Sequence, residues 1–134
     1  MRLRINHLGI VVHNIEKSLK AYLEDYGFRQ ISSIITIENQ GVRVVVLRNE
    51  INNVNIELIE PWGENSPVLN FLARGGGINH ICYETEDFEE VLRKFGNKVV
   101  RKPSPTPVEY FNGGRTVFIH RHGELIEFLE KKTG

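Results

Sequence analysis

The sequence has a single cysteine, Cys82, so no internal disulfide bond can form. Proteins without disulfides are typical of a reducing compartment, and we therefore expect a cytoplasmic protein. No apolar run approaches the roughly 20 residues that cross a bilayer. Residues 1–7 also lack the separate apolar segment of a signal peptide. We expect neither a leader of this kind nor a membrane partner.

An excess of one charge is absent as well, because 17 basic residues balance 17 acidic residues. Nucleic-acid binding normally needs a basic excess or a basic stripe, so we expect no nucleic-acid partner. Apolar residues make up 40% and charged residues 25% of the chain, as in an ordinary globular protein. A length of 134 residues fits one domain, or two small halves that share one core.

Two short motifs are present, and each occurs twice. The tripeptide Ile-Asn-His at residues 5–7 recurs 73 residues later, at 78–80. The tripeptide Ile-Glu-Leu at residues 56–58 recurs 70 residues later as Ile-Glu-Phe, at 126–128. Short matches can arise by coincidence, but two at nearly equal separations favour an internal duplication.

The hydrophobic patterns between these motifs repeat in the same order. In the first half they predict a strand, a helix and three strands at residues 3–13, 15–26, 28–37, 42–47 and 54–59. In the second half they predict the same series at residues 78–84, 87–95, 98–101, 116–121 and 125–129.

The repeated order predicts an α+β fold in one domain spanning residues 1–134. Its two βαβββ modules, about residues 1–61 and 78–134, are joined by a linker at 62–77 and related by a pseudo-twofold axis. We expect them to form one curved mixed sheet with a metal-binding cleft.

Both repeated motifs contain a side chain that can bind a metal. His7 and His80 lie in the first strands of the two halves, and Glu57 and Glu127 lie in the last strands. A twofold relation between the halves would bring the four residues together. Two imidazoles and two carboxylates suit one divalent ion, namely Zn, Ni, Co, Mn or Fe. Alternatively, the glutamates face solvent and the histidines are hydrogen-bonded core residues.

This duplicated plan resembles the vicinal oxygen chelate (glyoxalase/bleomycin resistance/dioxygenase) superfamily. Within it, the chain is most similar to methylmalonyl-CoA epimerases. The most specific features are Ser66-Pro67 after the fourth predicted strand and the Gly-Gly-x-x-His pattern at residues 76–80.

The resemblance implies a metal-dependent isomerase or epimerase that moves a proton beside a carbonyl of a small molecule, for which an acyl-CoA thioester is a candidate. It casts Glu127 as both metal ligand and catalytic base. Some epimerases have a second catalytic glutamate where this chain has Val44, so a two-base mechanism would need another group or a larger catalytic role for Glu57. Arg115 is a candidate for binding an anionic carrier or carboxylate, and Trp62 for lining the cleft.

Two further features bear on the substrate and the assembly. Residues 102–114 contain three prolines and differ from the glycine-rich loop of epimerases, which suggests a different acyl group or carrier, or only a stiff connection. Members of the fold often dimerise, so a homodimer is a candidate assembly.

Other functions of the same fold are alternatives. Bacterial glyoxalase I, a lactoylglutathione lyase, shares the ligand order, but Val11 and Glu60 or Pro61 replace the residues that hold glutathione, and an acid there would repel it. A metal-free small-molecule binding protein of this fold would normally have lost the ligand set. Ring-cleaving dioxygenases are usually longer chains.

Overall fold

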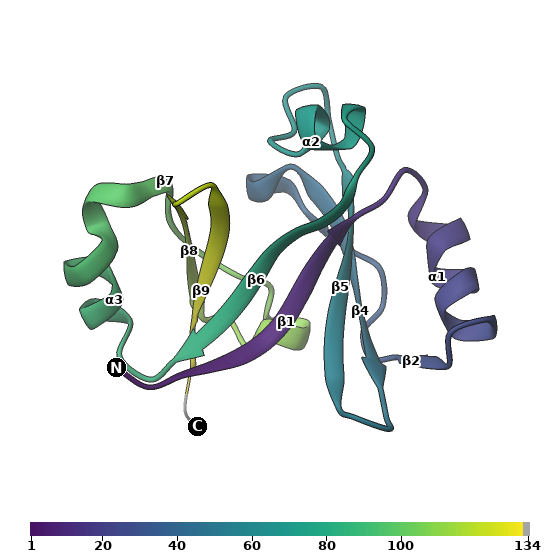
Figure 1. The fold of residues 1–134 in the computed structure, drawn as a ribbon, viewed down its shortest axis with the longest axis horizontal. Coiled ribbons are helices and arrows are strands. Elements are labelled where there is room, and N and C mark those ends of the chain that lie inside the picture. Colours follow the sequence, from purple (N-terminus) through teal and green to yellow (C-terminus); the bar gives the residue numbers. More distant parts are fainter. Residues whose placement is uncertain (133–134) are drawn as a thin grey trace. The chain divides into compact units, whose positions relative to one another are not determined.

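The computed structural model describes residues 1–132, which form two compact units (Figure 1). One unit is His7–Asn79, and the other combines Met1–Asn6 with the chain from His80 onward. Strand β1, Leu3–Val11, therefore contributes residues to both. No helix among the described residues has the length and apolar character needed to cross a membrane.

The His7–Asn79 unit is a mixed sheet with a helix packed on it. Its strands lie in the order β2–β4–β5–β1, and β3 also pairs with β4. Strands β4 and β5 are antiparallel, whereas β5 and β1 are parallel. After β1 the elements are α1 (Ile15–Glu24), β2 (Phe28–Gln30), β3 (Ile35–Ile37), the 3-10 turn η1 (Glu38–Gln40), β4 (Val42–Asn49), β5 (Val54–Pro61) and α2 (Leu69–Ala73).

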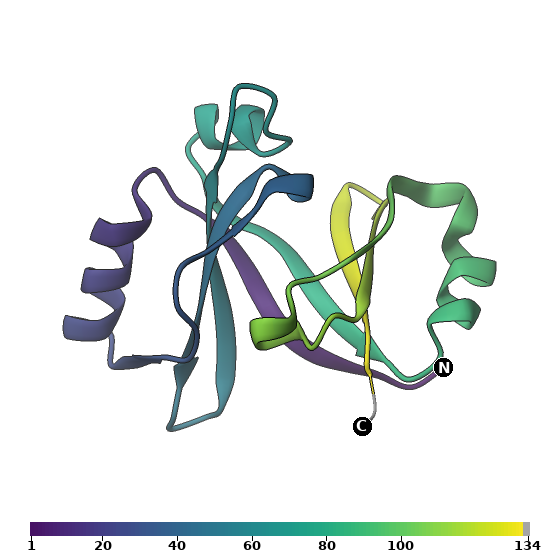
Figure 2. The same ribbon diagram turned by 180° about the vertical axis from the view of Figure 1, so that it is seen from behind.

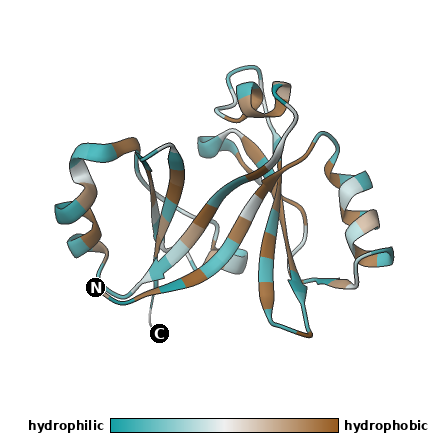
Figure 3. Ribbon diagram, viewed as in Figure 1, coloured by the Kyte–Doolittle hydropathy of each residue, from teal (hydrophilic) through white to brown (hydrophobic). Residues whose placement is uncertain are grey.

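Helix α1 begins where two carboxyl or amide oxygens accept its first N–H groups. The Asn14 side chain accepts from the N–H of Lys17, as an N-cap does. Glu60 on β5 accepts from the N–H of Ile15 at 2.8 Å, which ties the helix to the sheet. Ile15 is fully buried in a cluster with apolar residues of β4 and β5, namely Val45, Leu47, Ile56 and Leu58. Figure 3 shows hydrophilic (teal) and hydrophobic (brown) residues alternating along the helices and strands.

The unit that contains His80 repeats this plan. Its strands lie in the order β6–β9–β8–β7, with β6 and β9 parallel and the other pairs antiparallel. One face of this sheet packs on α3 through an apolar cluster of Phe88, Val91, Val117, Ile119 and Phe128. The elements are β6 (Gly77–Thr85), α3 (Phe88–Phe95), the 3-10 turn η2 (Gly96–Lys98), β7 (Val99–Pro105), α4 (Val108–Phe111), β8 (Arg115–Arg121) and β9 (Glu124–Glu130).

The predicted α+β class and the βαβββ order of each half are confirmed, with one strand divided. The single strand predicted at residues 28–37 is two short strands, β2 and β3. Between them the N–H groups of Ile31 and Ser32 both donate to the carbonyl of Val46, and the Ser32 hydroxyl accepts from the N–H of Val46. Two residues thus face one, which interrupts the regular ladder as a bulge does.

The proline-rich stretch at residues 102–114, which follows the strand predicted at 98–101, contains regular structure. Strand β7 runs on to Pro105. Helix α4 follows it and is the short green coil in the view from behind (Figure 2). Strand β7 stands at the end of the strand order of its unit. Because proline cannot donate to a neighbouring strand, such an edge position is where Pro103 and Pro105 are tolerated.

Candidate active site

The first pair of predicted ligands lies in the His7–Asn79 unit. His7 on β1 is 1% exposed and Glu57 on β5 is 7% exposed. The His7 Nε2 and Glu57 Oε1 atoms are 3.6 Å apart. Residues on either side of Glu57 pack toward α1, so the alternation of the strand turns the carboxylate to the opposite face. A carboxylate buried this deeply needs a compensating partner.

The second pair lies in the other unit and is closer. His80 on β6 and Glu127 on β9 are 5% and 6% exposed, and His80 Nε2 lies 3.1 Å from Glu127 Oε1. The hydroxyl of Thr116 on β8 donates to Glu127 Oε2 at 2.5 Å. The ring of Phe118 stands edge-on to the His80 ring, with centroids 5.3 Å apart. The carboxylate of Glu127 is thus held at both oxygens.

The two pairs are built with the same strand register. Gly9, two residues after His7, is the cross-strand partner of Glu57. Cys82, two residues after His80, is the cross-strand partner of Glu127. In both units the strands concerned are parallel neighbours. This equivalence supports the duplication, and the burial of both glutamates excludes the alternative in which they face solvent.

Val44 lies on the same face of its sheet as Glu57, but in an apolar setting. It is opposite Ile59 on β5, and Val46, two residues on, is opposite Glu57. The Val44 side chain is 1% exposed and packs in a cluster with Val11, Ile37, Val42 and Ile59. This position therefore supplies apolar packing and no acid.

The predicted substrate-binding residues have structural contacts of their own. The Arg115 guanidinium donates to Glu89 on α3 and to Glu130, each at 2.9 Å, and lies 4.7 Å from the ring centre of Phe88. These hydrogen bonds raise the pKa of Arg115 and lower the pKa of the Glu130 carboxyl. The Trp62 side chain is 48% exposed, and the backbone N–H of Trp62 donates to the carbonyl of Gly41. Their roles toward a substrate stay predictions.

Two residues near Glu127 were not found by sequence reasoning. Thr116 was assigned only to a strand, and its hydrogen bond to Glu127 depends on the pairing of β8 with β9. Arg101 is half-buried on β7, with its guanidinium 5.6 Å from the ring centre of Phe118. Burial lowers the pKa of Arg101, and the negative charge of Glu127 opposes that effect. Neither residue forms a sequence motif.

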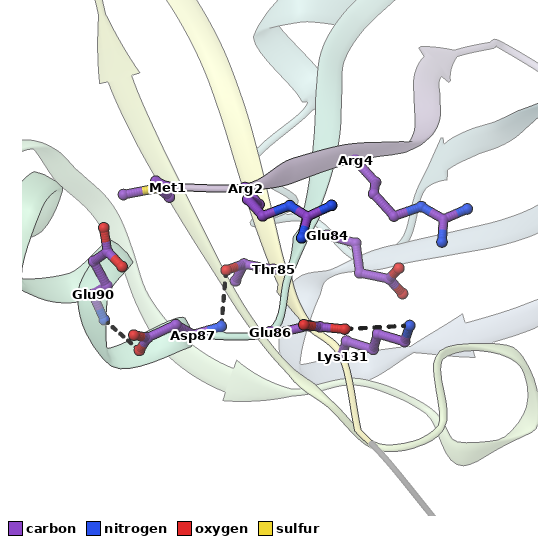
Figure 4. Close-up of a pocket in the computed structure, with 9 residues that line it drawn as sticks. All are labelled: Met1, Arg2, Arg4, Glu84, Thr85, Glu86, Asp87, Glu90 and Lys131. Carbon is purple, nitrogen blue, oxygen red and sulfur yellow. Dashed lines mark hydrogen bonds and ion pairs between the residues drawn. The ribbon is translucent and has the colours of Figure 1, made fainter.

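A surface pocket of about 350 Å³ in the same unit has a different character (Figure 4). Its charged side chains carry both signs, and Lys131 lies 3.7 Å from Glu86. None of the four predicted ligands lines it. The lining residues are Met1, Arg2, Arg4, Glu84, Thr85, Glu86, Asp87, Glu90 and Lys131.

Sequence comparison gives matches over most of the chain. Residues 6–118 match the model of the Glyoxalase/Bleomycin resistance protein/Dioxygenase superfamily. The mitochondrial methylmalonyl-CoA epimerase of Dictyostelium discoideum is 34% identical over 133 residues, covering 96% of this chain and 78% of that protein. An ethylmalonyl-CoA/methylmalonyl-CoA epimerase of Cereibacter sphaeroides is 31% identical over 134 residues, covering 96% of this chain and 89% of that protein.

Solved structures that are similar to this chain also include methylmalonyl-CoA epimerases. A methylmalonyl-CoA epimerase in complex with methylmalonyl-CoA and NH4+ is 28% identical, with a TM-score of 0.82 over 99% of this chain and 97% of that chain. The Mycobacterium tuberculosis methylmalonyl-CoA epimerase, at 24% identity, has a TM-score of 0.84 over 96% of this chain and 88% of that chain, which shows a shared fold.

Proposed function

This chain belongs to the glyoxalase/bleomycin resistance protein/dioxygenase superfamily, and we propose that within it the chain is a metal-dependent epimerase of an acyl-CoA thioester. The reaction moves a proton on the carbon beside the thioester carbonyl. The observation that carries the proposal is the buried His–Glu pair, built twice with the same strand register. The epimerase names of relatives at 34% and 31% identity support the choice of reaction.

The proposed metal ligands are His7, Glu57, His80 and Glu127, together holding one divalent ion. Each pair offers an imidazole nitrogen and a carboxylate oxygen within 3.6 Å of one another, and all four side chains are buried. This donor set fits Zn, Ni, Co, Mn or Fe, and a cation would compensate the two buried carboxylates. An ion held by these residues would supply a Lewis acid, which would polarise the thioester carbonyl and acidify the neighbouring C–H.

The proposed base is the Glu127 carboxylate, which takes the proton and can return it. The hydrogen bond from Thr116 holds Oε2 and so orients the carboxylate. Inversion requires a proton donor at the other face of the carbon. Glu57 is the proposed second acid, because the family position that some epimerases fill with glutamate is Val44 here.

The alternatives are weaker on the same observations. The named relatives are epimerases, which favours that reaction over a glyoxalase I-like lyase. Glu60, whose charge was expected to repel glutathione, is paired with Arg43 at 2.7 Å and accepts from the N–H of Ile15, so that repulsion is not counted against glyoxalase I. A metal-free binding protein would not need two buried His–Glu pairs. Arg115 as a carrier-binding residue, Trp62 at the cleft, a homodimer and a cytoplasmic location stay proposals.

Deuterium exchange tests the function directly. Protein loaded with each candidate metal is incubated in D2O with methylmalonyl-CoA or ethylmalonyl-CoA, and deuterium at the carbon beside the thioester is followed by mass spectrometry. We expect exchange that depends on metal, with about one ion per chain. Because the proposed second acid, Glu57, is also a proposed metal ligand and Val44 supplies no dedicated acid, exchange at one face of that carbon should be faster than full inversion. A fully metal-loaded protein that exchanges neither thioester would refute the proposal.

A further inference from the structure

Arg101 is brought to its position by an irregularity of β7. Val99 is opposite Ile119 on β8, yet Arg101, two residues later, is opposite Phe118, one residue earlier on β8. Val100 is therefore the extra residue of a bulge, and its side chain is 59% exposed. In a regular antiparallel ladder Val100 would oppose Phe118, and Arg101 would point to the α3 face. Bulges commonly re-aim side chains next to active sites.

The face that Arg101 reaches is the one that carries the proposed base. Phe118, the partner of Arg101, is also the cross-strand partner of Glu127 on β9. Residues directly opposite one another in a sheet project from the same face, so the three side chains form one row. The Arg101 guanidinium lies over the Phe118 ring, and the charges of Arg101 and Glu127 interact.

A cation in this row serves a substrate that carries a negative charge next to the reacting carbon. The carboxylate of Glu127 has the same sign of charge as an anionic acyl group, and a guanidinium in the same row adds an attraction for that group. The planar fork of arginine also matches a carboxylate through two parallel hydrogen bonds, which a lysine cannot provide. The phosphates of coenzyme A are separated from the acyl carbon by the long pantetheine arm, so the acyl group is the better match.

We infer that Arg101 is a specificity-determining residue that binds a carboxylate on the acyl group and selects malonyl-type thioesters over neutral ones. This inference rests on the proposed acyl-CoA epimerase function and narrows its substrate class. The bulge in β7, an edge strand that contains prolines, would thus have a role in substrate binding that no sequence motif indicated.

Binding measurements test the assignment without relying on turnover. Methylmalonyl-CoA is compared with isobutyryl-CoA, in which a methyl group replaces the carboxylate, by isothermal titration calorimetry. We expect wild type to bind methylmalonyl-CoA at least about tenfold more tightly, as for a charge-assisted hydrogen bond. In Arg101→Gln this preference should be lost, while the affinity for isobutyryl-CoA changes less than about twofold. Arg101→Lys, which keeps the charge without the fork, should retain part of the preference.

Arg121→Gln is the matched control, because the Arg121 guanidinium also lies over a phenylalanine ring, 5.7 Å from the centre of Phe95, but that ring is on α3. It should keep the wild-type preference. Equal affinity of wild type for the two ligands, absence of binding, or an equal loss for both ligands in Arg101→Gln would overturn the inference. Thermal unfolding identifies a variant that fails to fold, in which case Arg101→Lys decides. Deuterium exchange by wild type is scored separately, so the proposed function and the Arg101 assignment can fail independently.

Discussion

Replacing Glu127 by glutamine separates proton transfer from the structural role of this side chain. The amide has nearly the same shape, so its oxygen can still accept from Thr116 or bind a cation, but it cannot take up a proton near neutral pH. We expect Glu127→Gln to retain most of its bound metal and to lose proton exchange. Loss of a general base reduces a rate by about 10²- to 10⁴-fold, which corresponds to about 3–5 kcal/mol in the activation barrier.

The effect on stability should be much smaller than the effect on rate. The hydrogen bond from Thr116 to Glu127 changes from a charge-assisted to a neutral one, a loss of about 1 kcal/mol. Removing a buried charge offsets part of that loss. For a chain of 134 residues the melting temperature should therefore fall by no more than about 5 °C.

Deuterium exchange, metal content by plasma mass spectrometry and thermal unfolding are measured on the same preparations. Glu124→Gln, an exposed residue at the start of β9, is the matched control and should behave as wild type in all three. Thr116→Val keeps the Glu127 carboxylate but removes its hydrogen bond, so it should slow exchange less than Glu127→Gln does. If Glu127→Gln exchanges deuterium at the wild-type rate, another group is the base.

Three further outcomes are expected. His80→Ala should lose bound metal as measured by plasma mass spectrometry, because an imidazole ligand is removed outright; full retention would remove His80 from the ligand set. Gly114→Ala should lower the melting temperature by more than 10 °C, because a Cβ atom there would overlap the carbonyl of Glu130. Gly96→Ala is the control and should be tolerated, because a Cβ atom at residue 96 would have no neighbouring atom within 4 Å. In Arg115→Gln, Glu130 loses the hydrogen bonds that lower its pKa. A lowered pKa stabilises the folded protein above the pKa of the unfolded chain, about 4.3, and this stabilisation is lost as the pH falls through the pKa of the folded protein. The variant should therefore melt about 3 °C below wild type above about pH 5, as expected for a partly exposed pair, and the difference should shrink at lower pH. A deficit that grows toward acid pH would contradict this assignment.

The four candidate ligand residues could be singled out because their motifs repeat, and their binding of a metal stays a proposal. A single histidine or glutamate in a predicted strand has several structural explanations. The repeated Ile-Asn-His motif at residues 5–7 and 78–80, however, indicated equivalent positions in two halves. The structure places His7 with Glu57, and His80 with Glu127, in the same register. Repetition therefore carried information that no single residue held.

The neighbours of the site could not be predicted in the same way, because they depend on strand pairing. Regular alternation along β7 would place Arg101 on the α3 face, and only the bulge at Val100 reverses this. Thr116 reaches Glu127 across a strand pair, 11 residues away in the chain. The division of residues 28–37 into two strands has a similar origin, since it follows from hydrogen bonds between Ser32 and Val46. Each of these features arises from contacts that sequence periodicity does not contain.

The shared register of the two pairs also bears on how the protein would acquire the proposed ion. Hydrogen bonding between parallel strands places Glu57 opposite Gly9, two residues after His7. It places Glu127 opposite Cys82, two residues after His80. A slip of one residue would turn either carboxylate to the helix-covered face, so the ladder must break before a pair can separate. The donor atoms are consequently preorganised by the backbone, and their ordering is completed during folding. A chelator should thus leave a folded apoprotein ready to accept a different divalent ion, unlike a zinc finger, which unfolds when its metal is removed.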